Sequence, residues 1–182
     1  MRATHLGMCF GVRDAIDLAL ERGGAAPLTI LGDLVHNAAV LQRLDERGIA
    51  VAHDPGQVKT HTVMVTAHGA SNTAIARTRA LGFDVVEATC PLVRTAHQAV
   101  RALVRDGYHP IVVGQRHHVE VRGITEDLEA CDVVLEDADL DAVDERPRIG
   151  VVSKNTQPIG RVSRLVPLNR AKKLASEVHY VA

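Results

Sequence analysis

The sequence predicts an α/β protein built from two small, doubly wound, mostly parallel domains. Short apolar runs alternate with helical patterns along the chain, an order that places helices on both faces of a parallel sheet. In the first half, strand–turn–helix units repeat within about 95 residues. The second half repeats the rhythm, so we expect one domain at 1–90 and another at 91–182.

The expected strands are short apolar runs bounded by turn residues, which is the pattern of strands buried inside an α/β domain. In the first half they lie at 28–31, 62–66 and 83–86. In the second half they lie at 110–113, 132–135, 149–152 and 178–181. In such sheets the ligand site lies at the carboxyl ends of the strands, so functional side chains are expected in the turns after these runs.

Helices are expected where apolar residues recur three and four positions apart. Five stretches show this spacing: 11–22, one ending at 48, one ending at 82, 91–107, and one around 162–166. The acidic stretch 136–145 is expected to be a solvated loop or a short helix.

Composition excludes several classes of protein. The chain has 21 basic and 22 acidic residues and a net charge of −1, which gives no electrostatic basis for binding nucleic acid. Aromatic residues make up 2% of the chain, so stacking platforms for single-stranded bases are lacking. No apolar run approaches the ~18 residues of a membrane span, and no signal-peptide pattern is visible. We therefore expect a soluble, cytoplasmic protein with no nucleic-acid or membrane partner.

Two of the three cysteines lie just ahead of predicted helices. Cys90 follows the strand at 83–86, and Pro91 takes the favoured first helical position. Cys9 lies in the glycine-flanked turn GMCFGV, ahead of the helix at 11–22. A lone cysteine is more often a small buried residue, but a helix N-terminus also stabilises a thiolate. Two cysteines in this setting, in a cytosolic chain, indicate metal or redox chemistry more than a disulfide.

Other polar residues gather at the carboxyl ends of the predicted strands. They are His36, His68, His118, Glu120, Asn155 and Thr156. One histidine at such a turn is more often a cap or a surface residue, but three at equivalent positions, with a carboxylate and two cysteines, indicate a shared pocket. The remaining seven histidines lack this placement and are assigned structural roles: His5, His53, His61, His97, His109, His117 and His179.

The chemistry of this set leaves alternatives open. Two thiolates suit an iron–sulfur cluster or zinc. The three histidines could bind zinc, but the close pairs typical of zinc sites, such as C-x-x-C or H-x₃-H, are missing. Histidines together with Asn and Thr side chains could instead hold an anionic substrate, which leaves Glu120 free to donate or relay protons to it.

Six motifs carry a resemblance to a known family. In order they are GMCFGV around Cys9, LVHN around His36, TAHGAS around His68, EATCPLV around Cys90, HHVEVRG around His118 and Glu120, and NTQP around Thr156. A single motif such as AHG is weak, but six in this order span essentially the whole chain. Together they resemble the 4-hydroxy-3-methylbut-2-enyl diphosphate reductases, the LytB or IspH family, which catalyse the last step of the methylerythritol phosphate route to isoprenoids.

The resemblance implies a reductive dehydroxylation that yields isopentenyl and dimethylallyl diphosphates, with a [4Fe-4S] cluster as cofactor. It implies cluster ligation by Cys9 and Cys90 and a proton donor in Glu120. It also implies that the diphosphate substrate is bound by His36, His68, His118, Asn155 and Thr156. Reduced ferredoxin or flavodoxin is the implied electron donor.

The departures from the family pattern are also informative. The family has three cysteine ligands from three domains, whereas Cys131 lies in EACDVV, which matches none of its cysteine motifs, and is interpreted as a structural thiol. The third family domain is expected to be absent, because its cysteine would follow the segment that ends this chain. Smaller departures are Gln115 for His, Val119 for Pro, Lys154 for Gln and Asn155 for Thr.

Two functions from different classes follow. The first is a reductase of this family that needs a second chain, or a homodimer, to complete its site. The alternative is a truncated, non-catalytic relative that acts as a binding or assembly module.

Overall fold

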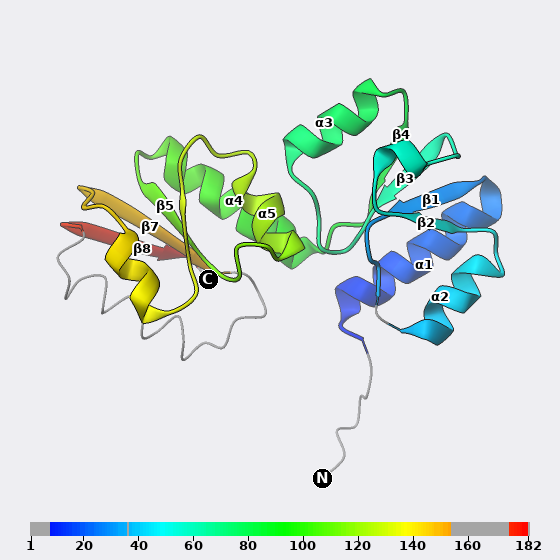
Figure 1. Cartoon of the computed structure of the whole chain (residues 1–182), viewed down its shortest axis with the longest axis horizontal. Coiled ribbons are helices and arrows are strands. Elements are labelled where there is room, and N and C mark those ends of the chain that lie inside the picture. Colours follow the sequence, from blue (N-terminus) through cyan, green and yellow to red (C-terminus); the bar gives the residue numbers. More distant parts are fainter. Residues whose placement is uncertain (1–7, 36, 154–174, 182) are drawn as a thin grey trace, which may run out of the picture. The chain divides into compact units, whose positions relative to one another are not determined.

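A computed structural model describes residues 8–35, 37–153 and 175–181 of the chain. The chain divides into two compact units, Met1–Pro91 and Leu92–Ala182, which are called unit 1 and unit 2 below. Each unit contains one four-stranded sheet in which all neighbouring strands are parallel. Figure 1 shows the elements of both units along the chain. The predicted fold class, α/β with parallel sheets, is confirmed.

Unit 1 has the strand order β2-β1-β3-β4. Its elements are α1 (Phe10–Ala25), β1 (Leu28–Leu31), α2 (Ala38–Asp45), β2 (Ala50–Ala52), η1 (Pro55–Gln57), β3 (Thr62–Val65), α3 (Asn72–Ala80) and β4 (Asp84–Glu87). The chain moves in opposite directions across the sheet from β1 to β2 and from β3 to β4. Right-handed crossovers therefore place α2 and α3 on opposite faces of the sheet, as Figure 1 shows.

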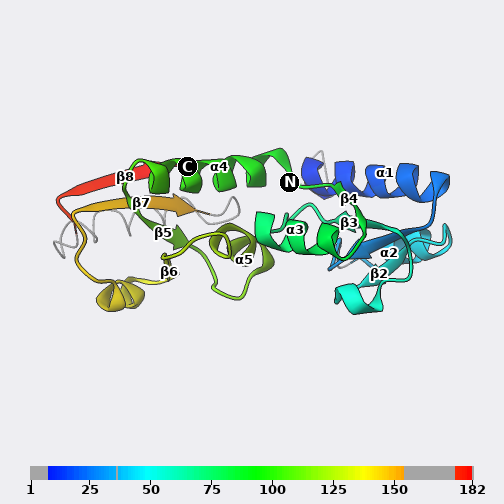
Figure 2. The same ribbon diagram turned by 90° about the horizontal axis from the view of Figure 1, so that it is seen from above.

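Unit 2 repeats this arrangement with the strand order β6-β5-β7-β8. Its elements are α4 (Pro91–Arg105), β5 (His109–Val113), α5 (Val119–Thr125), β6 (Asp132–Val134), η2 (Asp137–Ala142), β7 (Arg148–Ser153) and β8 (Glu177–Val181). Figure 2 shows α4 running along the sheet of unit 2. The two units thus share one strand order. Counted along the chain within each unit, the strands lie across the sheet in the order second, first, third, fourth.

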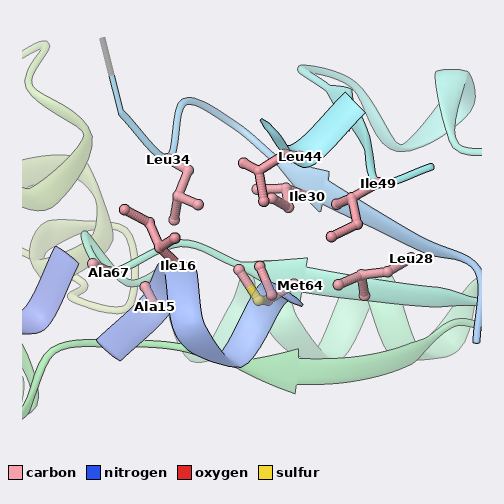
Figure 3. Close-up of a cluster of buried hydrophobic side chains, with 10 residues drawn as sticks. Ala15, Ile16, Leu28, Ile30, Leu34, Leu44, Ile49, Met64 and Ala67 are labelled. Carbon is pink, nitrogen blue, oxygen red and sulfur yellow. The ribbon is translucent and has the colours of Figure 1, made fainter. Parts of the chain in front are cut away.

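The core of unit 1 lies between its sheet and the helices α1 and α2 (Figure 3). Leu28, Ile30 and Met64 point to this face from β1 and β3, in agreement with the two-residue period of a strand. Ala15, Ile16 and Ala19 of α1 and Leu44 of α2 cover them. Each fully buried Leu, Ile or Met side chain contributes about 1.5–3 kcal/mol, so this cluster anchors the strand ends described below.

Unit 2 buries apolar residues on both faces of its sheet. On one face, Val112 and Val152 pack against Ala96, Val100 and Leu103 of α4 and against Val121 and Ile124 of α5. On the other face, Ile111, Val113, Ile149 and Val151 pack with Leu140 and Val143. The helices α4 and α5 therefore share one interface, and this interface positions the polar residues of unit 2.

Three elements differ from the sequence-based expectation. The strand β2 was not predicted, because it has only three residues, two of them exposed. The helix α5 was not among the predicted helices, although Val121 and Ile124 show helical spacing. The helix α1 continues through Gly23, where a Cβ would lie 2.4 Å from Cγ1 of Ile49, so close packing and not helix termination explains that glycine. The helix expected around 162–166 lies outside the described residues.

Candidate active site

The two cysteines of the sequence motifs lie at the N-termini of two helices. Cys9 is the N-cap of α1, with an exposed side chain. Cys90 is half-buried and lies between β4 and Pro91, the first residue of α4. Its N–H donates to the carbonyl of Ala67 at 3.0 Å, and the N–H of Ala88 donates to the carbonyl of Val65 at 3.1 Å. The parallel pairing of β3 and β4 thus continues beyond both strands and fixes the backbone at Cys90.

Gly11 brings the Cys90 thiol against the first turn of α1. A Cβ at Gly11 would lie 2.6 Å from Sγ of Cys90 and 2.8 Å from its Cβ, well inside van der Waals contact. The residue two positions before Gly11 is Cys9, so unit 1 gathers both motif cysteines at one corner. Neither forms a disulfide. Two free thiols at helix N-termini are the donor type that iron–sulfur clusters use, so these residues fit such a group.

His68 lies at the same edge of the unit 1 sheet. It follows Ala67, whose carbonyl accepts the hydrogen bond from Cys90, and its side chain is half-buried. Gly69 then turns the chain with a positive φ of 73°, a conformation that glycine adopts without steric cost. Ser71 caps α3 by accepting from the N–H of Ala74 at 2.9 Å. This turn therefore places His68 beside the Cys90 backbone.

In unit 2, His118 caps α5. Its Nδ1 accepts a hydrogen bond from the N–H of Glu120 at 3.2 Å, which requires that Nδ1 carries no proton. The neutral ring then carries its proton on Nε2, so Nε2 is the nitrogen of this ring that acts as a donor. The cap fixes the tautomer as well as the start of the helix.

Glu120 lies in the first turn of α5 and is 3% exposed. The next residue, Val121, is fully buried, and Ile124 one turn later is 1% exposed. These two apolar side chains hold α5 against α4 and the sheet. Glu120 is thereby shielded from bulk water, which suits a carboxyl group that exchanges protons with a substrate and not with solvent.

Three predicted site residues, His36, Asn155 and Thr156, lie outside the described residues. Their neighbours are described. Asn37 caps α2 by accepting from the N–H groups of Ala39 and Val40 at 3.1 and 3.2 Å. Ser153 ends β7, and its hydroxyl lies 3.3 Å from the Tyr180 hydroxyl of β8. In the part of the chain that the structure describes, no group of three or more His, Cys, Asp and Glu side chains is arranged to hold a metal ion.

One residue near the site was missed by the sequence analysis. His97 of α4 was assigned a structural role, yet the structure places it in the interface with α5, 8% exposed. Burial lowers the pKa of His97 and is the largest cause of the shift. The positive charge of Arg101 also lowers this pKa, whereas Asp127 and Glu120 raise it. Its helical spacing from Val93 and Val100 was the available signal, because that spacing puts His97 on the buried stripe.

The sequence profile of the LytB protein family matches residues 1–179. The chain belongs to the LytB family. Among curated relatives, the 4-hydroxy-3-methylbut-2-enyl diphosphate reductase of Geobacter sp. (strain M21) is 35% identical over 158 residues, which is 85% of this chain and 56% of that protein. The Aquifex aeolicus (strain VF5) protein of the same name is 34% identical over 161 residues, with the same two coverages. This LytB chain therefore spans little more than half the length of these relatives.

Solved structures show the same architecture as this LytB chain. The E-1-hydroxy-2-methyl-but-2-enyl-4-diphosphate reductase from Plasmodium falciparum superposes with a TM-score of 0.85 at 24% identity, over 98% of this chain and 57% of that one. A second structure, an (E)-4-hydroxy-3-methyl-but-2-enyl diphosphate reductase, gives a TM-score of 0.81 at 29% identity, over 98% and 65%. Within the described residues of this LytB chain, no helix is both long and apolar enough to cross a bilayer.

Proposed function

We propose that the chain provides two domains of a 4-hydroxy-3-methylbut-2-enyl diphosphate reductase. The family match across residues 1–179 is the observation that carries this proposal. The reaction breaks the bond between carbon and the substrate hydroxyl and forms a carbon–hydrogen bond. It consumes two electrons, from reduced ferredoxin or flavodoxin, and two protons. The products are water and either isopentenyl or dimethylallyl diphosphate.

Cys9 and Cys90 are the proposed ligands of a [4Fe-4S] cluster. Both thiols are free, and the packing of Cys90 on Gly11 keeps its sulfur beside the helix turn that Cys9 begins. When bound, the cluster supplies electron transfer to the substrate. A family member holds its cluster with three cysteines, so we propose that the remaining ligand comes from polypeptide outside this sequence.

The proposed substrate-binding residues are His36, His68, His118, Asn155 and Thr156, of which the three histidines bind the diphosphate. For His118 the structure supports a specific role, because its Nδ1 is occupied by the Glu120 N–H. A neutral His118 donates from Nε2 to a phosphate oxygen, and it keeps capping α5 while doing so. The same hydrogen bond ties the diphosphate-binding residue to the backbone of the proposed acid.

Glu120 is the proposed proton donor. Its carboxyl gives a proton to the leaving hydroxyl, which then departs as water. The carboxylate is reprotonated before the next turnover. The burial of Glu120 supports this role, since water is kept from the carboxyl during the transfer. Glu120→Gln keeps the shape and removes the acid, so this variant should bind the cluster normally and lose turnover.

A first experiment tests the cofactor. The chain is purified anaerobically, loaded with iron and sulfide, and analysed for iron, acid-labile sulfide and its ultraviolet–visible spectrum. Cys9→Ser and Cys90→Ser should each lose iron. Cys131→Ser is the matched control, because this half-buried cysteine lies in unit 2, where burial raises the pKa of its thiol. Equal iron loss in all three variants, or none in any, would contradict the assignment.

A second experiment tests whether this chain alone can catalyse the reaction. We expect the loaded chain alone to show weak or no turnover with reduced flavodoxin, because 56% coverage of its relatives leaves out part of their structure. A homodimer, in which each copy supplies two thiolates, is one way to complete four cluster ligands, and light scattering with and without iron detects it. A chain that binds no iron, remains monomeric and does not turn over would support the non-catalytic binding module instead.

A further inference from the structure

His97 and Glu120 lie buried in the same helix interface of unit 2. Their exposed fractions are 8% and 3%, and they are the two buried charged or ionisable residues that the structure describes. His97 belongs to the stripe of α4 that also contains Val93, Ala96 and Val100. The packing of Ala96 and Val100 with Val121 and Ile124 brings this stripe against α5, close to its first turn.

The Nε2 atom of His97 is fully buried and has no hydrogen-bond partner among the described residues. Leaving a polar atom unsatisfied in the interior costs about 1–3 kcal/mol. An apolar residue of similar size would avoid this cost at the same position of α4. A buried imidazole that costs stability in an otherwise well-packed interface is a candidate for a functional role.

Charged groups surround the ring on both helices. Arg101 lies one turn further along α4, and Asp127 follows α5. The two form an ion pair, with Nη2 of Arg101 3.2 Å from Oδ2 of Asp127. Glu120 completes the set from the start of α5. Burial is the largest cause of the lowered pKa of His97; Arg101 also lowers this pKa, whereas Asp127 and Glu120 raise it. The ring is therefore neutral near pH 7, with its charge sensitive to Glu120.

We propose that His97 is a positioning residue for Glu120, and that the two side chains form one coupled acid–base pair in the α4–α5 interface. This proposal rests on the proposed function, in which Glu120 is the acid. After Glu120 gives its proton to the leaving hydroxyl, a carboxylate remains in a buried site. A nearby imidazole that gains a proton from solvent more easily when the carboxylate is charged stabilises that state.

The test follows the His97 ring by NMR in the full chain labelled with ¹³C- and ¹⁵N-histidine. His97→Gln identifies the resonance by its disappearance. The midpoint of the His97 titration should lie below the ordinary histidine value of 6.5. Because Glu120 raises the pKa of His97, Glu120→Gln should move the midpoint to still lower pH. Arg101→Gln should move it upward, because Arg101 acts in the opposite direction.

Glu129→Gln is the matched control. It removes the same charge from an exposed residue beyond α5, and it should leave the His97 midpoint unchanged. An equal midpoint in wild type and Glu120→Gln, with the expected shift in Arg101→Gln, would overturn the coupling. Shifts of equal size in Glu120→Gln and Glu129→Gln would also overturn it, because they would show a general charge effect.

A second measurement separates positioning from simple structural support. In the complete, cluster-loaded enzyme, the pH profile of turnover should change in His97→Gln and in His97→Leu. Gln retains an amide near the place of Nε2, so it should retain more turnover than Leu. Equal losses in both variants, with an unchanged pH profile, would make His97 structural. The NMR result stands without turnover, so failure of the coupling is distinguishable from failure of the proposed reductase function.

Discussion

The two units have the same order of strands but bury different polar groups. In unit 1 the buried polar side chains that the structure describes are hydroxyls: Thr29, Thr66, Ser71 and Thr78. In unit 2 they are an imidazole and a carboxyl, His97 and Glu120. A hydroxyl is satisfied locally, as when Ser71 caps α3 or Thr78 donates to the carbonyl of Ala74 at 2.8 Å. Among the described residues, the interior of unit 1 thus holds no buried acid, base or histidine, whereas that of unit 2 holds two ionisable side chains. This difference on one scaffold illustrates that function lies in sites placed on a fold.

The largest effect should come from the equivalent first strands of the two sheets. Ile30 of β1 is 0% exposed and Ile111 of β5 is 2% exposed. Replacement of either residue by alanine should lower the free energy of unfolding by about 2–5 kcal/mol, since each leaves a cavity in a packed core. Chemical denaturation measures the change. Leu81→Ala, at a position that is 61% exposed, is the control and should have little effect. A tolerated Ile111→Ala would show that the two cores are not comparable.

The next largest effect should come from the glycine that contacts Cys90. Gly11→Ala forces a Cβ to within 2.6 Å of Sγ, and rotation of the thiol does not relieve the 2.8 Å contact with the Cys90 Cβ. We expect a loss of about 1–3 kcal/mol from overpacking, together with reduced iron content. Gly24→Ala in the same helix meets no atom within 4 Å and should be neutral or slightly stabilising.

Unit 2 offers a counterpart for this test. Gly150 of β7 has a similar close contact, since a Cβ there would lie 2.7 Å from Cδ1 of Leu103. Gly150→Ala should lower stability to a similar extent without reducing the iron bound per folded molecule. Iron loss of the same size in Gly11→Ala and Gly150→Ala would show that the contact between Gly11 and Cys90 has no specific role in iron binding.

The strand ends could be predicted from the sequence, whereas the burial of individual polar residues could not. The apolar run 28–31 coincides with β1, and Cys90 lies between a strand and a helix as expected. Such signals are local, because they depend on the period and on turn residues. His97 shows the limit of this reasoning. Its role depends on which face of α4 meets α5, and α5 was itself not among the predicted helices.

The predicted arrangement of the candidate site is supported only in part by residues that the structure describes. Extension of the β3–β4 pairing brings His68 and Cys90 to one edge, as the rule for parallel strands requires. The contact of Gly11 with Cys90 could not be predicted, because it depends on how α1 packs against the end of β4. The predicted roles of His36, Asn155 and Thr156 stay predictions.

A smaller effect is expected at the helix caps. Removal of the Ser71 hydroxyl in Ser71→Ala should cost about 1 kcal/mol, because the N–H of Ala74 loses its acceptor. In unit 2, His118→Asn should keep α5 capped, since Asn is among the best N-cap residues. His118→Ala removes both the cap and the imidazole. Thermal unfolding should therefore rank His118→Asn above His118→Ala, while both variants lose diphosphate binding. Equal stability of the two would show that the cap is unimportant.

The smallest effect at neutral pH should be the linkage of stability to His97. The folded state lowers the pKa of this residue, so between that value and 6.5 the unfolded chain binds more protons than the folded chain. Stability is therefore complete above pH 6.5 and decreases as the pH falls through this window. A single group gives a slope of at most about 1.4 kcal/mol per pH unit. His97→Gln should reduce the slope, measured by denaturation at several pH values, and an unchanged slope would assign the effect to other groups.

The parallel pairing within each unit has a consequence for synthesis on the ribosome. Each described strand pair joins two strands of the same unit. Even the paired residues of unit 1 that are farthest apart in sequence, such as Leu28 and Thr62, both belong to unit 1. Domains generally fold as units, the N-terminal one first, during translation. Unit 1 can therefore complete its sheet while most of unit 2 is still being made. Cys90 is the penultimate residue of unit 1, so its contact with the first turn of α1 can form only after the rest of the unit has been synthesised. Slow translation just after Pro91 would lengthen the period in which the folded corner exists alone and both thiols are open to iron or to oxidants.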